Sequence, residues 1–324
     1  MRIFLAPMEG VVDYTMRDLL TRLGGFDRCV TEFVRINDQY LPAKVFHRYC
    51  PELAHGGKTL AGVPVYTQLL GGNPYYMAAN AIKAEAVGAP GIDLNFGCPS
   101  KTVNNSDGGS VLLREPDRVH DIVKAVRDAV SEHIPVTAKI RLGFNDASLL
   151  DEITDGVASA GASELCIHAR TRLDGYKPPA HWQHIAVIQK KLAIPVIVNG
   201  EIWGPKEARQ AQLESGCADV MLGRGALSRP DLARAIRADQ DGQVYTAMAW
   251  QEVQELMISY IPDTGQANHK FTPNRVKQWL NYLRREYPEA EALFQQLKHL
   301  KSLEEIRHCL HTWRAPKGEL YESN

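Results

Sequence analysis

Short apolar, β-branched runs alternate with longer amphipathic stretches from residue 3 to about residue 238, and this alternation limits the possible folds most strongly. Eight strand–helix units in roughly 240 residues are typical of a TIM (β/α)8 barrel rather than of a doubly wound sheet. The expected strands are residues 3–7, 29–34, 64–69, 91–95, 136–141, 164–168, 195–199 and 218–222. Residues 40–61, after the second expected strand, contain Pro, Gly and His and predict an irregular loop.

The pattern changes after about residue 245, where strand signals stop. Four amphipathic stretches with short connections follow, and we expect helices at 249–262, 272–287, 288–297 and 303–313. The sequence therefore predicts two domains, a TIM barrel over 1–242 and a small helical bundle over 243–324.

Composition is that of an ordinary globular protein, with 44% hydrophobic and 23% charged residues. The net charge of −1 means that any nucleic-acid surface must be a local patch. The six cysteines form no C-x-x-C pair and no metal-ligand spacing, which favours reduced thiols and no bound metal. No apolar run approaches the length of a membrane span, and no signal peptide is evident. We therefore expect a cytoplasmic protein that does not enter a membrane and acts as a monomer.

Nearly every expected strand ends on a polar or conformationally special residue. In a TIM barrel all strand carboxyl ends converge on one face, where active sites form. Any one of these residues alone could simply terminate a strand, but the whole series predicts an active face.

The ends of the last two strands predict a phosphate pocket. Asn199-Gly200-Glu201 follows strand seven, and Gly223-Arg224-Gly225 follows strand eight. Backbone N–H groups, a short helix start and a guanidinium commonly hold a phosphate at this position in such barrels. The alternative is a pair of tight turns without a ligand.

Three other strand ends are candidates for binding a flat cofactor. Lys139 at a barrel mouth needs an anionic partner, which could be the N1–C2=O edge of a reduced flavin, a substrate enolate or a carboxylate. Gln68 could donate to and accept from a flavin edge, and the Pro7-Met8-Glu9-Gly10 turn could approach a ring face. Structural roles for Gln68 and Met8 are equally compatible with the sequence.

Cys98 stands in a loop between Gly97 and Pro99, just beyond the fourth expected strand. Cys29, Cys166 and Cys217 lie in or beside strands and are expected to be inert core thiols. A loop cysteine at a barrel mouth is a candidate nucleophile or acid. Because no base stands near Cys98 in the sequence, and a thiol with a pKa of about 8.5 is mostly protonated at neutrality, we favour the acid.

The segment Asp93-Leu94-Asn95-x-Gly97-Cys98-Pro99 resembles the signature of the tRNA-dihydrouridine synthases. The order of further motifs is also similar to that family, through the barrel and into a helical tail. These motifs are Ala6-Pro7-Met8-Glu9-Gly10, Gln68-Leu69, Lys139-x-Arg141, His168-x-Arg170-Thr171, Asn199-Gly200 and Gly223-Arg224-Gly225.

The resemblance implies a barrel that binds FMN, uses NADPH as reductant and passes hydride to C6 of a uridine in tRNA. It implies that Cys98 is the catalytic acid that protonates C5, completing reduction to dihydrouridine. By the same resemblance FMN would be held by Pro7, Met8, Glu9, Gln68, Lys139, Asn199, Gly200, Glu201, Gly223, Arg224 and, near the phosphate-ribityl chain, His168.

A basic segment with interleaved aromatic residues, 269–285, carries five Lys or Arg residues and no acid. A base in folded tRNA must leave its loop to reach a buried flavin, so a positive surface is needed beside the barrel. The alternative is a solvated basic helix whose Trp279 belongs to the core.

Thr31–Arg48 and Arg275–Arg284 resemble one bacterial branch, the C-type synthases, which modify uridine 16 of the D loop. By that similarity tRNA would be contacted by Arg35, Asn95, Tyr176, Arg275, Lys277, Trp279 and Tyr282.

Two other functions compete with this interpretation. A flavin-dependent dehydrogenase acting on a free pyrimidine would not need the basic helical tail. A non-catalytic RNA-binding barrel would be colourless and would not depend on Cys98.

Overall fold

Parallel strands form the centre of the computed structural model, which describes residues 1–261 and 272–315. Neighbouring strands pair in sequence order except for the short β3, and the β1–β9 and β2–β4 pairings close an eight-stranded barrel. The strands are β1 (Ile3–Leu5), β2 (Arg28–Val30), β3 (Val34–Arg35), β4 (Val65–Leu70), β5 (Ile92–Asn95), β6 (Val136–Arg141), β7 (Glu164–His168), β8 (Val196–Asn199) and β9 (Asp219–Leu222). The predicted TIM barrel is confirmed.

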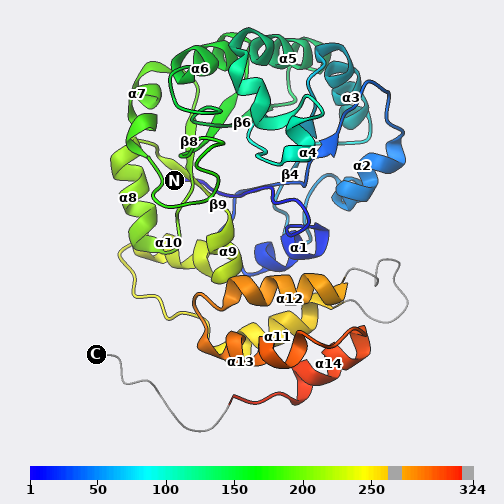
Figure 1. Cartoon of the computed structure of the whole chain (residues 1–324), viewed down its shortest axis with the longest axis vertical. Helices are drawn as coiled ribbons and strands as arrows, with labels where there is room; N and C mark the ends of the chain where they lie inside the picture. Colours follow the sequence, from blue (N-terminus) through cyan, green and yellow to red (C-terminus); the bar gives the residue numbers. More distant parts are fainter. Residues whose placement is uncertain (262–271, 316–324) are drawn as a thin grey trace. The chain divides into compact units, whose positions relative to one another are not determined.

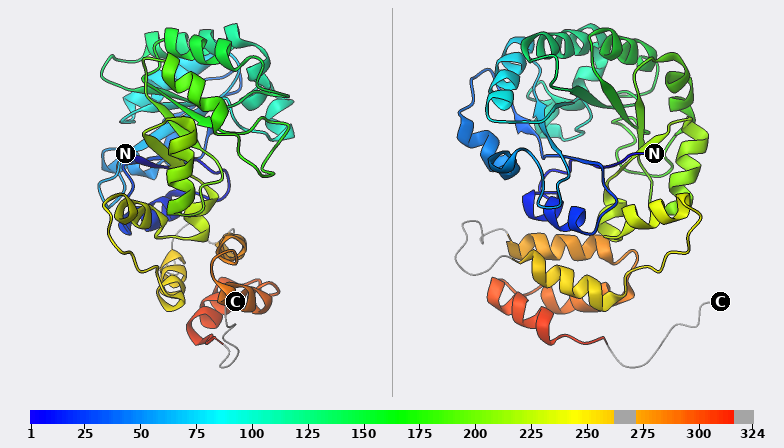
Figure 2. Two further views of the ribbon diagram at one scale, coloured as in Figure 1. Left: turned by 90° about the vertical axis from the view of Figure 1, so that its left-hand side faces the viewer. Right: turned by 180° about the vertical axis from the view of Figure 1, so that it is seen from behind.

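Helices surround the barrel, as Figure 1 shows from one end and Figure 2 from behind. They turn an apolar face inward, as α5 does with buried Val119, Ile122, Val123 and Val126. These helices are α1 (Tyr14–Arg22), α3 (Pro74–Ala86), α5 (Pro116–Ala129), α6 (Leu150–Ser159), α7 (Gln183–Lys191), α8 (Pro205–Ser215) and α10 (Leu232–Gln240).

The second expected strand, 29–34, is interrupted in the structure. β2 ends at Val30, and the two-residue β3 begins at Val34. Between them the Thr31 hydroxyl accepts a 3.0 Å hydrogen bond from the Gln68 N–H. A side chain therefore replaces part of the backbone ladder here, which an alternation pattern does not reveal.

The expectation of an irregular loop over 40–61 was wrong. The segment contains α2 (Ala43–Tyr49) and a short 3-10 helix, η1 (Pro51–His55). Phe46 of α2 is fully buried, and Glu52 of η1 forms a buried ion pair with Arg17 of α1. These contacts with residues distant in the sequence order the segment. Its Pro and Gly residues alone therefore gave a wrong prediction of an irregular loop.

An apolar cluster inside the barrel contains Phe4, Ala6, Val30, Tyr66, Cys166, Ile197 and Met221. Cys29, Cys166 and Cys217 are buried, as expected of core thiols, and burial raises their pKa values to about 12, 12 and 11. They are therefore protonated near neutral pH.

The chain divides into two compact units, the barrel with residues 1–226 and 231–245, and a second unit with residues 227–230 and 246–324. The described part of the second unit is helical, with α11 (Trp250–Tyr260), α12 (Thr272–Leu283), α13 (Pro288–Leu297) and α14 (Leu303–Thr312). Its core includes Trp250, whose ring lies 5.9 Å from that of Trp313. In the described parts of both units, no helix is long and apolar enough to cross a membrane.

Candidate active site

The barrel brings the predicted strand-end residues into register. Asn95 of β5 is paired with Lys139 of β6, and His168 of β7 is paired with Asn199 of β8. Because successive parallel strands end at one face, four residues that are far apart in the sequence share one rim.

The Cys98 loop is held by hydrogen bonds at both backbone groups of the cysteine. Asn95 Oδ1 accepts the N–H groups of Gly97 and Cys98, each at 2.9 Å. The Cys98 carbonyl accepts from Ser110 Oγ at 2.8 Å, from Ser110 N at 3.1 Å and from Asn104 Nδ2 at 3.0 Å. The loop therefore presents a thiol of fixed position rather than a mobile one.

The thiol of Cys98 is half-buried, whereas Cys29, Cys50, Cys166 and Cys217 are buried. Burial raises the pKa of Cys98, while a backbone hydrogen bond at Ser100 and the charge of Arg141 oppose the shift. A raised pKa keeps the thiol protonated at neutral pH, which suits a proton donor better than a thiolate nucleophile.

A buried polar chain connects the Cys98 loop to the strands below it. Asn95 Nδ2 donates to Gln68 Oε1 at 2.9 Å, and Gln68 Nε2 donates to Asp93 Oδ2 at 2.7 Å. Thr137 Oγ1 donates to Asp93 Oδ1 at 2.6 Å. Gln68 is fully buried, with one donor and one acceptor position of its amide not used by these bonds.

Lys139 extends from β6 to Asn199, with 3.2 Å between Nζ and Asn199 Oδ1. The Asn199 amide is oriented by its own bond to the Met221 carbonyl at 2.8 Å. Burial lowers the pKa of Lys139, and the neutral amide does not compensate the ammonium charge. The position suits an anionic or strongly accepting ligand group.

Cations gather around His168. Burial and the charges of Arg141, Lys139, Arg170 and Arg224 hold the pKa of His168 well below its usual value, so the imidazole is neutral. Burial and the charges of Arg224 and Arg141 lower the pKa of Arg170 to about 10. Such mutual repulsion favours the binding of an anion.

Glycine and strained backbone shape the rim beside this cluster. Gly200 has a φ of +113°, and a Cβ there would lie 2.7 Å from His168 Cδ2. Glu201 adopts a φ of +58° and pairs with Arg170, while Trp203 Nε1 donates to Glu201 Oε1 at 2.9 Å. A left-handed conformation at a glutamate costs roughly 1 kcal/mol, so these contacts hold Glu201 in place.

The predicted turn after β1 lies next to the predicted turn after β9. A Cβ on Gly223 would lie 3.8 Å from Met8 Sδ, in ordinary contact. Gly10, which follows Met8 and Glu9, donates its N–H to Glu32 Oε1 at 2.6 Å. The structure thus places the Pro7–Gly10 and Gly223–Arg224 segments together on one side of the mouth.

Of the residues predicted to contact RNA, three belong to the barrel. Tyr176 is 53% exposed, and Arg141 and Arg224 lie 5.2 and 5.0 Å from its ring centre. Arg35 is half-buried and donates to the Thr102 carbonyl at 3.3 Å. Asn95 is 9% exposed and anchors the Cys98 loop, a role that sequence analysis did not assign to it.

Four more predicted RNA residues lie on α12. Trp279 is 1% exposed, its Nε1 donates to the Leu227 carbonyl at 3.0 Å, and its ring packs on Tyr260. The expectation that its side chain touches RNA is therefore corrected, because the indole belongs to the core of the second unit. Lys277 Nζ donates to the Lys298 and Leu300 carbonyls, and Arg275 and Tyr282 are half-buried. The beginning of the basic segment, 269–271, lies outside the described residues.

Several residues of the site had no role assigned to them from the sequence. Arg141 Nε donates to the Gly97 carbonyl at 2.7 Å, and its Nη1 donates to the carbonyls of Thr171 and Gly175. Period-two spacing was the available signal, because Asp93, Arg141 and Arg170 each lie two positions from a predicted site residue on the same strand or its continuation. Asn104 and Ser110 carried no comparable signal.

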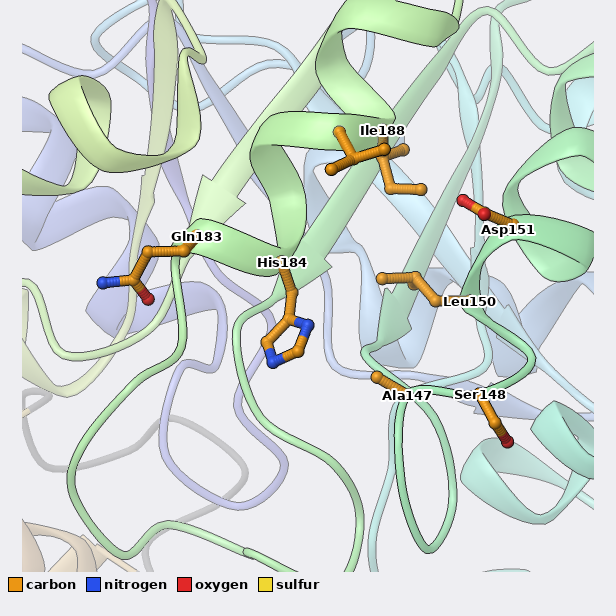
Figure 3. Close-up of a pocket in the computed structure, with 8 residues that line it drawn as sticks. Ala147, Ser148, Leu150, Asp151, Gln183, His184 and Ile188 are labelled. Carbon is orange, nitrogen blue, oxygen red and sulfur yellow. The ribbon is translucent and has the colours of Figure 1, made fainter.

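An open pocket of about 330 Å³ lies elsewhere on the barrel. Its lining residues, drawn in Figure 3, include Gln183 and His184 from the start of α7 and Leu150 and Asp151 from the start of α6. None of the predicted site residues lines this pocket, whose lining is Ala147, Ser148, Leu150, Asp151, Gln183, His184, Val187 and Ile188.

The closed barrel, its cation-lined mouth and the fixed thiol define the class of TIM-barrel enzymes. A family model described as dihydrouridine synthase matches residues 4–314. The chain therefore belongs to the dihydrouridine synthases, a flavin-dependent family of oxidoreductases.

Similar proteins cover almost the whole chain. A tRNA-dihydrouridine(16) synthase of Shewanella oneidensis is 50% identical over 311 residues, 96% of this chain and 97% of that protein. The Vibrio cholerae protein of the same name is 48% identical over 97% of this chain and 96% of its own length. The Salmonella typhimurium protein of that name is 47% identical over 96% and 98%.

Solved structures with a similar fold are much more distant in sequence. Histamine dehydrogenase from Rhizobium gives a TM-score of 0.55 at 13% identity, covering 80% of this chain and 48% of that one. A variant of NCR from Zymomonas mobilis gives 0.51 at 15% identity, covering 77% and 89%. This likeness demonstrates the barrel fold alone.

Proposed function

We propose that this protein reduces the C5=C6 bond of a uridine in the tRNA D loop to 5,6-dihydrouridine, at position 16. The observation that carries the proposal is 50% identity, over 96% of this chain, to a relative named tRNA-dihydrouridine(16) synthase. The position of Cys98 in a fixed loop at the barrel mouth supports the same chemistry.

The mouth fits FMN as the flavin. A phosphate monoester is a dianion, and the positive charges of Arg141, Lys139 and Arg224 around His168 favour the binding of such an anion. Arg170 in the same cluster is paired with Glu201. Lys139 offers a positive charge to an electron-rich ring edge, and Gln68 retains one donor and one acceptor position. FMN would be held by Pro7, Met8, Glu9, Gln68, Lys139, His168, Asn199, Gly200, Glu201, Gly223 and Arg224.

When bound, FMN would supply the hydride for C6 of the uracil, with NADPH as its reductant. Cys98 donates its thiol proton to C5, where the enolate carries negative charge after C6 is reduced. The raised pKa of Cys98 keeps this proton in place until the enolate forms. The resulting thiolate is reprotonated from solvent, and the half-buried position of Cys98 allows this.

The tRNA must present the uridine turned out of its loop. Tyr176 offers an exposed ring whose position is set by Arg141 and Arg224. We assign further tRNA contacts to Arg35 and Asn95 in the barrel and to Arg275, Lys277 and Tyr282 on α12. Trp279 supports α12 from within the core.

The test is dihydrouridine content, mapped by position, in tRNA from cells that lack the gene and carry either the wild-type copy or Cys98→Ala. We expect dihydrouridine at position 16 to be restored by the wild-type copy and reduced at least 100-fold with Cys98→Ala, because general acid catalysis contributes about 10²–10⁴-fold. Loss at another position instead would contradict the assignment to uridine 16.

Two further measurements address the competing functions. Purified protein should be yellow with bound flavin, whereas a non-catalytic RNA-binding barrel would be colourless. Removal of residues 246–324 should abolish turnover of tRNA, whereas a dehydrogenase of free pyrimidines would keep its activity on the small substrate.

A further inference from the structure

We infer that Asp93 is a positioning residue that fixes the Cys98 loop through Gln68 and Asn95. The inference deepens the proposed function and rests on it for the role of Cys98. Asp93 lies on β5, is 3% exposed, and is two residues before the strand end from which the Cys98 loop departs.

The connection is continuous in hydrogen bonds. Asp93 Oδ2 accepts from Gln68 Nε2 at 2.7 Å, and Gln68 Oε1 accepts from Asn95 Nδ2 at 2.9 Å. Asn95 Oδ1 then accepts the N–H groups of Gly97 and Cys98. The side chains of Gln68 and Asn95 thus link the buried Asp93 carboxylate to the backbone of the candidate acid.

Donor and acceptor rules give this chain a single direction. Backbone N–H groups only donate, so Asn95 must turn Oδ1 towards Gly97 and Cys98 and Nδ2 towards Gln68. Gln68 must then turn Oε1 towards Asn95, which aims Nε2 at position 93. A carboxylate oxygen accepts at that point, so both ends of the chain select the same orientation of the two amides.

Because the Gln68 amide is buried, loss of its hydrogen bond to Asp93 would carry a free-energy cost. Gln68 is fully buried, so without Asp93 its Nε2 would be left unsatisfied and the amide would move or admit water. Movement of Gln68 would loosen Asn95, and the Cys98 backbone would lose its N–H anchor. The Cys98 carbonyl would remain bound to Ser110 and Asn104, so the loop would loosen rather than unfold.

An asparagine at position 93 should preserve the chain. Its Oδ1 could accept from Gln68 while its Nδ2 donates to Thr137 Oγ1, and the Thr137 hydroxyl has the Ile92 carbonyl 3.5 Å away as its own acceptor. Alanine would break the chain at its first link. The two substitutions therefore separate positioning from the negative charge of Asp93.

The experiment measures alkylation of Cys98 by iodoacetamide at pH 8, resolved by peptide mass spectrometry, on the full purified chain. A Cys309→Ser background removes the other half-buried thiol, since the remaining four are buried. The matched control is Asp219→Ala, which removes a similarly buried strand carboxylate that binds Arg2 at the opposite end of the barrel. Circular dichroism establishes that each variant is folded.

We expect Asp93→Ala to speed alkylation of Cys98 about tenfold, the ratio that corresponds to the loss of one strong buried hydrogen bond. Asp93→Asn and Asp219→Ala should stay within about twofold of the background protein. The serine side chain of the Asp93→Ser variant is too short to reach Gln68. This variant replaces Asp93→Ala if the alanine variant does not fold.

Unchanged alkylation in folded Asp93→Ala or Asp93→Ser protein, or equal acceleration by Asp219→Ala, would overturn the inference. Acceleration by Asp93→Asn as large as that by alanine would overturn it as well. The readout needs no tRNA, so a wild-type protein that forms no dihydrouridine would contradict the proposed function and leave this comparison valid.

Discussion

At Cys98 the fold holds a half-buried thiol in its protonated form. An acid with a raised pKa keeps its proton to higher pH and loses it only as the pH rises through that value. Since the usual cysteine pKa is about 8.5, the donor form should persist through neutrality and disappear in the alkaline range.

We therefore expect the single-turnover rate of uridine reduction to be level between about pH 6 and pH 8 and to fall above about pH 9. The rate of flavin reduction by NADPH without tRNA, followed by absorbance, is the control and should not share this decline. A rate that rises with pH through this range would instead indicate a thiolate nucleophile.

At the scale of single residues, sequence position identified Cys98 but not what holds it. Asn104 and Ser110 bind its carbonyl from six and twelve residues further along the chain. Arg141 reaches the Gly97 carbonyl from the next strand. Hydrogen bonds of this kind depend on side-chain direction across the rim, which a linear motif does not contain.

Among the elements, α1 and η1 are joined by a buried ion pair. Arg17 and Glu52 are fully buried, with 2.7 Å between Arg17 Nε and Glu52 Oε1. Arg17 also donates to the carbonyls of Val12 and Tyr49, both at 3.1 Å. This pair orders the segment that the sequence predicted to be an irregular loop.

We expect Arg17→Met to destabilise the barrel by about 3–5 kcal/mol, because it leaves Glu52 buried without its partner. Urea unfolding followed by circular dichroism measures the change. The double variant Arg17→Met/Glu52→Leu should recover most of the loss, since both charges are then absent. A single variant as stable as wild type would show that water reaches Glu52 and replaces the guanidinium.

For α12 the proposed contact with tRNA makes a separate prediction. Arg275→Ala should weaken tRNA binding several-fold and reduce the slope of log affinity against log salt by about one, as expected for one lost phosphate contact. Filter binding at several salt concentrations measures both quantities.

Lys301→Ala is the matched control, because Lys301 is an exposed cation between α13 and α14 and is not among the assigned contacts. NADPH oxidation without tRNA should be unchanged in both variants. An equal loss of binding in the two would indicate a diffuse positive field rather than a contact at Arg275.

At the scale of the whole molecule, the buried thiols make the free energy of unfolding depend on pH. Burial raises the pKa values of Cys29, Cys50 and Cys166 to about 12. The unfolded chain releases these protons near pH 8.5 and the folded chain does not, so the unfolded state binds fewer protons above that pH. The contribution of these thiols to the free energy of unfolding is therefore fully present below about pH 8.5 and is lost progressively as the pH rises towards 12.

We expect the free energy of unfolding to fall by roughly 1.4 kcal/mol per buried thiol per pH unit in this range. Urea titrations at pH 8, 9 and 10 measure the slope. Cys166→Ala should remove one thiol's share, whereas replacement of the half-buried Cys309 should change the slope less. A stability independent of pH up to 10 would contradict the burial of these thiols.

The sequence by itself determined the barrel, its strand ends and the candidate acid. Apolar alternation and strand-terminating polar residues are local signals, and the closed parallel barrel collects them on one face. Eight repeated units made that outcome predictable, and the motifs around Cys98 made the family predictable.

Only the tertiary structure decided which polar groups touch and which aromatic residues face inward. Trp279 shares its helix with solvent-facing residues, and its burial became evident only from the Leu227 carbonyl and Tyr260 beside it. Asp93 likewise acquires its role from Gln68 on the neighbouring strand. The physical reason is that burial and hydrogen bonding depend on distances between segments, which residue order along one segment does not specify.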